Sequence, residues 1–149
     1  MTEDSESKAS AGISASVIQR VAMNQYVKAE YPLSEVTARI IAAATEVHRA
    51  LGPGFEEVIY QRALARELPA HQLEFNRKAW MDVRYKGEKV GSKRVDFVVD
   101  EVMVEIKAKA LLEEVDFVQA LSYLKASGYK VGLLINFGAA KLQVKRLVN

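Results

Sequence analysis

Two apolar segments, separated by two acidic residues, constrain the fold of this chain more than any other feature. They are residues 94–99 (RVDFVV) and 102–107 (VMVEIK), on either side of Asp100-Glu101. Side chains alternate between the two faces of a strand, so one face of each segment is uniformly apolar and must be buried. The pattern predicts a β-hairpin packed on a core, with Val95, Phe97, Val99, Val102, Val104 and Ile106 facing that core.

The opposite face of the predicted hairpin carries charge. If the two-residue turn is symmetric, Asp96 lies opposite Glu105, and Arg94 lies opposite Lys107. Directly opposed like charges destabilise a sheet, but a divalent cation between two carboxylates favours both ionised forms. Lys107 on the same side can hold a nucleophilic water or stabilise negative charge on a phosphate. The pattern indicates metal-assisted phosphodiester hydrolysis; the alternative is a solvated hairpin face with mixed charges.

Apolar residues at helical spacing predict three helices after residue 33. The first begins with Ser34 as its N-cap and ends at Gly52-Pro53-Gly54. The second runs from about Glu56 to Leu68 and is stopped by Pro69. The third runs from about Val115 to Ser127.

Three further segments have the pattern of strands. Residues 79–86 alternate and precede an expected turn at Gly87-Glu88. Residues 130–137 are almost continuously apolar, as in a strand buried on both faces, and residues 141–148 fit a half-exposed strand. The order of elements predicts an α/β domain with a central mixed sheet flanked by helices.

The first 33 residues are predicted to be an arm outside this domain. Residues 1–14 are rich in Ser, Glu, Ala and Gly, which is typical of a flexible tail. Residues 16–30 fit a short amphipathic helix, which we interpret as a packing appendage rather than an oligomerisation element. The predicted organisation is therefore an arm over residues 1–33 and one domain over residues 34–149. A homodimer or a partner protein stays open.

Composition restricts the partners and the metals. The net charge of 149 residues is only +2, so any charge that attracts nucleic acid must be concentrated locally. There is no cysteine, so a metal must be held by carboxylates, carbonyls, water, His48 or His71, a set that suits Mg²⁺ or Mn²⁺. No apolar run approaches the ~20 residues that cross a bilayer, and no secretion signal is recognisable. We expect a cytoplasmic protein that does not bind membranes.

Several ordered motifs resemble a known family. Residues 54–60 (GFEEVIY) fit the G-x-x-E-x-x-Y signature that names a group of small bacterial proteins, and residues 46–53 look like its usual lead-in. Further matches are residues 85–87, 94–97, 104–108, 119–123, 134–138 and 145–149. That family is assigned to the PD-(D/E)xK nucleases, so the resemblance implies a restriction-endonuclease-like core. Residues 1–33 have no counterpart in it.

The resemblance also implies site residues. Asp96 looks like the first metal-binding carboxylate, and Glu105 and Lys107 look like the E-x-K element. The carbonyl of Ile106 and the helical Glu57 are implied as further metal ligands. His48 is similar to a metal-binding histidine of some RecB-like nucleases, but a hydrogen bond to a nearby carbonyl is the alternative.

Gln119 and Tyr123 are similar to the Q-x-x-x-Y helix of RecB-like nucleases. Because they are four residues apart, they share one helix face, where Gln119 can act on the phosphate and Tyr123 can bind nucleic acid. Arg94, Lys109 and Lys125 are candidates for phosphate contacts.

The predicted function is a Mg²⁺- or Mn²⁺-dependent nuclease that acts on DNA more readily than on RNA. Two alternatives use the same fold without catalysis. One is a nucleic-acid-binding module, and the other is an assembly protein.

Overall fold

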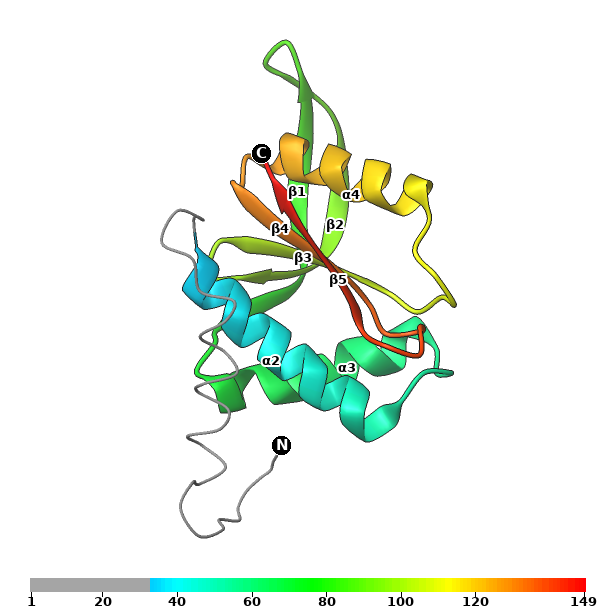
Figure 1. Cartoon of the computed structure of the whole chain (residues 1–149). Helices are drawn as coiled ribbons and strands as arrows, with labels where there is room; N and C mark the ends of the chain where they lie inside the picture. Colours follow the sequence, from blue (N-terminus) through cyan, green and yellow to red (C-terminus); the bar gives the residue numbers. More distant parts are fainter. Residues whose placement is uncertain (1–32) are drawn as a thin grey trace, which may run out of the picture.

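The computed structural model describes residues 33–149, so the predicted helix at residues 16–30 lies outside the described part (Figure 1). The helices are α2 (Ser34–Leu51), α3 (Glu57–Glu67) and α4 (Glu114–Ser127), with a 3-10 turn, η1 (Leu68–His71), after α3. The strands are β1 (Phe75–Tyr85), β2 (Glu88–Val99), β3 (Val102–Lys107), β4 (Val131–Asn136) and β5 (Gln143–Val148).

These elements form one mixed sheet between two layers of helices, as the sequence predicts. The five strands lie in the order β1-β2-β3-β4-β5. Strands β3 and β4 are parallel, the other neighbours are antiparallel, and α4 makes the crossover between the parallel pair. Figure 1 shows α2 and α3 on the side of the sheet opposite to α4. No helix of residues 33–149 is long and apolar enough to cross a membrane.

The two faces of the sheet bury different amounts of apolar surface. Five residues of the predicted apolar face pack on α2 and α3: Phe97, Val99, Val102, Val104 and Ile106. Val95 was predicted on this face but packs on the other, because the alternation shifts at Asp96. Val98 and Met103, on the other face, pack against Leu124 of α4. Each such side chain contributes roughly 1.5–3 kcal/mol by leaving water. Helix α4 therefore covers the middle of the second face and leaves polar residues at its edge.

The central hairpin has the predicted register over its inner half. Val99 pairs with Val102, Val98 with Met103, and Phe97 with Val104. The predicted pairs of Asp96 with Glu105 and of Arg94 with Lys107 are not part of this ladder. The prediction was wrong there because strands β2 and β3 diverge, and Arg94 pairs with β1 instead.

The divergence coincides with a bend in β1. Lys78 has a left-handed φ of 57° between the pairs Arg77–Phe97 and Ala79–Val95, so it lies opposite Asp96. A residue in the left-handed conformation changes the direction of the strand. Beyond it, β1 and β2 continue as a long hairpin that extends out of the body of the sheet (Figure 1). The turn of this hairpin is Lys86-Gly87 rather than the expected Gly87-Glu88, since Tyr85 pairs with Glu88.

Two smaller expectations were also wrong. The N-cap of α2 is Leu33, not Ser34, whose backbone already belongs to the helix. His71 was expected in a loop, but it is buried in η1 with its Nε2 3.0 Å from a carboxylate oxygen of Glu67. Pro69 ends α3 as predicted, and the chain then tightens into η1.

The turn of the central hairpin stores backbone strain that a glycine would relieve. Asp100 and Glu101 both have positive φ, 44° and 70°, which side chains other than Gly and Asn adopt at a cost. We expect Glu101→Gly to raise the free energy of unfolding by about 0.5–1 kcal/mol, measured by urea denaturation. Glu101→Ala removes the same charge but keeps the strain, so it should not stabilise. Equal effects of both variants would contradict the assignment of strain.

Candidate active site

Asp96 and Glu105 meet where β2 and β3 diverge. Each carboxylate accepts a hydrogen bond from the backbone of the opposing strand: Ile106 N–H donates to Asp96 Oδ2 (2.8 Å), and Asp96 N–H donates to Glu105 Oε2 (3.0 Å). These bonds satisfy amides that the interrupted ladder would otherwise leave without partners. Both carboxylates are thereby held on neighbouring strands at the edge of the α4 face.

Both carboxylates have raised pKa values, so their ionised forms are disfavoured. Burial, followed by the negative charge of Asp96, raises the pKa of Glu105 to about 7. Burial also raises the pKa of Asp96, against the hydrogen bond from Ile106. The ammonium groups of Lys107 and Lys93 oppose both shifts. The environment therefore disfavours the two ionised carboxylates, and a bound cation would favour both ionised forms.

Helix α3 contributes Glu57 and a residue that the sequence did not indicate, Gln61. Gln61 Nε2 lies 3.2 Å from both Glu57 Oε2 and Asp96 Oδ1, and its Oε1 accepts a hydrogen bond from Arg77 (3.1 Å). Partial desolvation, followed by the charge of Asp96, raises the pKa of Glu57. Gln61 therefore links the helical glutamate to the strand carboxylate. Its spacing of four residues from Glu57 was the available signal.

Tyr60 of the G-x-x-E-x-x-Y motif is buried in the core and supports the loop between α2 and α3. Its fully buried ring stacks on Phe137 with centroids 4.9 Å apart. Its hydroxyl donates to the carbonyl of Gly52 (2.5 Å) and accepts from Phe55 N–H (3.2 Å). This side chain fixes the loop between α2 and α3, and hence the start of the helix that carries Glu57.

Lys107 points to α4, where it meets Gln119, another predicted site residue. Its Nζ lies 3.4 Å from Gln119 Oε1 and 4.0 Å from Asp116 Oδ1. Asp116 also accepts a hydrogen bond from Glu113 N–H in the capping box of α4. The sequence did not indicate Asp116 as a site residue. It couples the beginning of α4 to the position of the lysine.

Lys109, predicted to contact phosphate, is held by two carboxylates. Its Nζ lies 2.9 Å from Asp116 Oδ2 and 3.3 Å from Glu113 Oε1. Its backbone N–H donates to buried Asn136, whose amide donates to the Lys109 carbonyl. A Cβ on Gly138 would come within 2.4 Å of Lys109 N. Asn136 and Gly138 therefore fix the chain just after the E-x-K element.

His48 has the contact that the sequence left open as the alternative to metal binding. Its Nε2 lies 3.0 Å from the carbonyl oxygen of Ala139, and its ring lies near Phe137. In the described residues, the structure records no polar contact that joins His48 to Asp96, Glu105 or Glu57.

The remaining predicted residues lie along α4 and the long hairpin. Tyr123 packs beside Lys93, whose Nζ is 4.9 Å from the ring centroid, and Arg94 lies over Trp80. Lys125 is exposed near the end of α4. Lys93 is a further residue that sequence reasoning missed, because only the hairpin geometry brings it near the carboxylates.

The chemistry of the donor set fits a hard divalent cation. Within residues 33–149, no three Asp, Glu or His side chains form a ready-made metal cluster. Mg²⁺, however, is usually bound by one or two carboxylates together with water and substrate phosphate. Asp96 and Glu105 provide two carboxylates, and burial, the main cause of their raised pKa values, disfavours ionised forms that a bound cation would stabilise.

The mixed sheet, the carboxylates on diverging strands and the following lysine define a nuclease-like α/β domain. The family model of the PD-(D/E)XK nuclease superfamily matches residues 34–147, and the chain belongs to this superfamily. No curated protein and no solved structure matches the chain.

The pH dependence of the free energy of unfolding tests the raised pKa of Glu105 without an activity assay. Because its folded pKa of about 7 exceeds the usual 4.5, stability is lost as pH rises from 4.5 to about 7. In EDTA, we expect the free energy of unfolding of Glu105→Gln, relative to that of the wild type, to rise by on the order of 1–3 kcal/mol between pH 5 and pH 8. Urea denaturation at both pH values measures this gain.

A matched control is Glu101→Gln, which changes an exposed glutamate in the turn of the same hairpin. This variant should follow the wild type at both pH values. A stability difference between Glu105→Gln and the wild type that does not change with pH would contradict the assigned titration.

Proposed function

We propose that this protein is a Mg²⁺- or Mn²⁺-dependent nuclease that hydrolyses phosphodiester bonds, in DNA more readily than in RNA. The observation that carries the proposal is the pair of buried carboxylates, Asp96 and Glu105, with Lys107 on the same side. Within its superfamily, we place the chain with the GxxExxY group and the RecB-like nucleases. The preference for DNA rests on that similarity.

The metal ligands that we propose are Asp96, Glu105 and the carbonyl of Ile106, with Glu57 completing the set from α3. A bound Mg²⁺ or Mn²⁺ would neutralise charge on the phosphate and acidify a coordinated water. Gln61 contributes by holding Glu57 and Asp96 in a common hydrogen-bond network. His48 is not included in the proposed set, because its Nε2 is engaged by Ala139.

Lys107 acts on the reacting groups in this proposal, and Gln119 positions it. The Lys107 ammonium orients the attacking water and stabilises negative charge that develops on the phosphate. Gln119 and Asp116 hold this ammonium group in place from α4. Arg94, Tyr123 and Lys125 contact the nucleic acid, whereas Lys109 stabilises the beginning of α4 through Asp116.

A second candidate is a nucleic-acid-binding module without catalysis. Binding that needs no metal and survives Asp96→Asn, without cleavage by the wild type, would favour it. A homodimer, a partner protein and a cytoplasmic location remain predictions.

Cleavage of labelled DNA and RNA with Mg²⁺ or Mn²⁺ tests the proposal. We expect the wild type to cut, and Asp96→Asn and Lys107→Ala each to lower the rate by at least about 100-fold, because Asp96 would hold the metal and Lys107 would stabilise negative charge on the phosphate. Gel electrophoresis of single- and double-stranded substrates measures the rates and the substrate preference.

Two control variants make the same types of substitution at exposed positions. Asp100→Asn lies in the turn of the central hairpin, and Lys141→Ala lies before β5. Both should cut at the wild-type rate. If the site variants cut as fast as the wild type, the activity comes from elsewhere and the proposal is wrong.

A further inference from the structure

The long β1–β2 hairpin concentrates positive charge. Between residues 78 and 94 there are six cations and two acids, a net charge of +4, whereas the whole chain carries only +2. The rest of the chain is therefore net negative. The cations are Lys78, Arg84, Lys86, Lys89, Lys93 and Arg94. This hairpin supplies the local charge that a nucleic-acid partner requires.

Most of these cations have no carboxylate partner. Asp82 pairs with Arg84 (3.2 Å) and Lys89 (3.4 Å). Among the described residues, the other four cations of the hairpin form no ion pair with an acid. Their charges are therefore available to phosphate groups.

Three of these cations lie over aromatic rings. Trp80 and Arg94, which pair across the hairpin, lie on one face of it, whereas Lys93 lies on the other face beside Tyr123 of α4. Lys93 is 4.9 Å from the ring centroid of Tyr123, Arg94 is 5.2 Å from that of Trp80, and Lys86 is 5.4 Å from that of Tyr85. Trp80 is 67% exposed and Tyr85 is 63% exposed, so a large part of each ring faces solvent. Exposed aromatic rings that alternate with cations are typical of surfaces that bind single-stranded nucleic acid.

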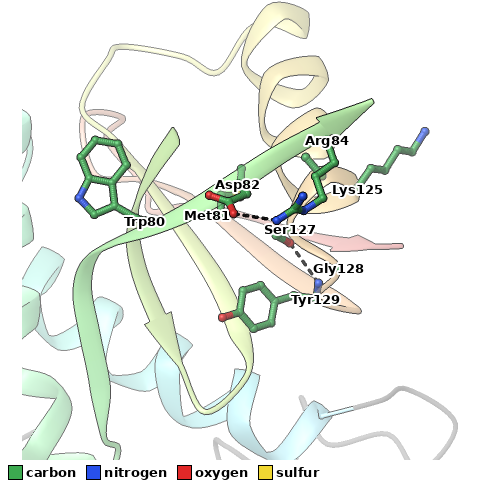
Figure 2. A pocket seen from close by; sticks show the side chains of 9 residues that line it. Trp80, Met81, Asp82, Arg84, Lys125, Ser127, Gly128 and Tyr129 are labelled. Carbon is green, nitrogen blue, oxygen red and sulfur yellow. Dashed lines mark hydrogen bonds and ion pairs between the residues drawn. The ribbon is translucent and has the colours of Figure 1, made fainter. Parts of the chain in front are cut away.

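A depression of about 530 Å³ lies between β1 and the end of α4, and Trp80 is one of its lining residues. Figure 2 shows Trp80 and Arg84 on β1, with Lys125 and Tyr129 from the end of α4 and the segment after it. Lys125, which the sequence predicted to contact phosphate, thus shares a depression with the exposed tryptophan.

The same surface leads to the carboxylates. Arg94 precedes Asp96 by two residues on β2, or roughly 7 Å of strand. Lys93 is close enough to lower the pKa of both Asp96 and Glu105. A polynucleotide bound along the hairpin would therefore pass directly into the site.

We propose that the β1–β2 hairpin binds unpaired nucleotides, with a base stacked on Trp80 and a phosphate on Arg94, which lies on the same face of the hairpin. The proposal rests on the proposed nuclease function and narrows its substrate to polynucleotides with a single-stranded segment next to the scissile bond. A base must leave its neighbours to stack on a side chain, and paired bases inside a duplex do not offer a free face.

Trp80 is the only tryptophan of the chain, so its fluorescence reports stacking directly. The experiment uses full-length Asp96→Asn protein without metal, titrated with oligo-dT, oligo-U and a blunt duplex of about 12 nucleotides. We expect the single strands to quench Trp80 emission and the duplex to leave it nearly unchanged. The two oligomers distinguish DNA from RNA. Equal quenching by the duplex, or no quenching at all, would overturn the proposal.

Substitutions test the same point by fluorescence anisotropy of a labelled oligonucleotide. Trp80→Ala should weaken single-strand binding by roughly 5- to 100-fold, and Trp80→Phe should retain most of the affinity because a ring remains. Val148→Ala, at an exposed apolar position on the opposite edge strand β5, should bind normally. Normal binding by Trp80→Ala would overturn the proposal.

The two proposals fail in different ways. If the wild type cleaves with metal while Trp80→Ala binds and cuts normally, the hairpin proposal is wrong and the nuclease proposal stands. If single strands quench Trp80 but the wild type cuts nothing, the nuclease proposal fails and the hairpin remains a binding surface.

Discussion

Strands β2 and β3 stop pairing after Phe97 and Val104, and two side chains take over the hydrogen bonds beyond that point. Asp96 and Glu105 each accept a backbone N–H from the opposing strand, which keeps the strands at a fixed separation although the ladder has ended. The arrangement places two carboxylates in a desolvated position where their charges repel. The interactions around it, from Gln61 on α3 to Lys107 and Lys93, either hold these carboxylates or oppose their charge.

The bend in β1 explains why the site and the binding surface adjoin. Lys78 takes a left-handed conformation opposite Asp96, and the β1–β2 hairpin leaves the sheet from there. The divergence that positions the two carboxylates thus also directs the basic, aromatic hairpin past them. One local feature of the backbone serves both the proposed chemistry and the proposed recognition of the substrate.

Periodicity in the sequence was sufficient for the elements and for the inner register of the central hairpin. An apolar alternation on two short segments has few solutions, and its two-residue turn holds even without glycine. The bend at Lys78 was not predictable, because a lysine carries no signal for a left-handed conformation in a strand. Gln61, Asp116 and Lys93 were missed for a related reason. Their roles arise from contacts between elements, whereas Glu57 and Gln119 were found through motifs of a known family.

The most direct test of the central claim is binding of Mn²⁺ to the full-length protein, measured by calorimetry at pH 6 and pH 8 without nucleic acid. If Asp96 and Glu105 form a cation site, affinity should rise with pH through about 7, because Glu105 must lose its proton, and Asp96→Asn should abolish binding. Proton release on binding at pH 6 should accompany it. Binding that does not depend on pH, or that Asp96→Asn retains, would show that these carboxylates do not form a metal site.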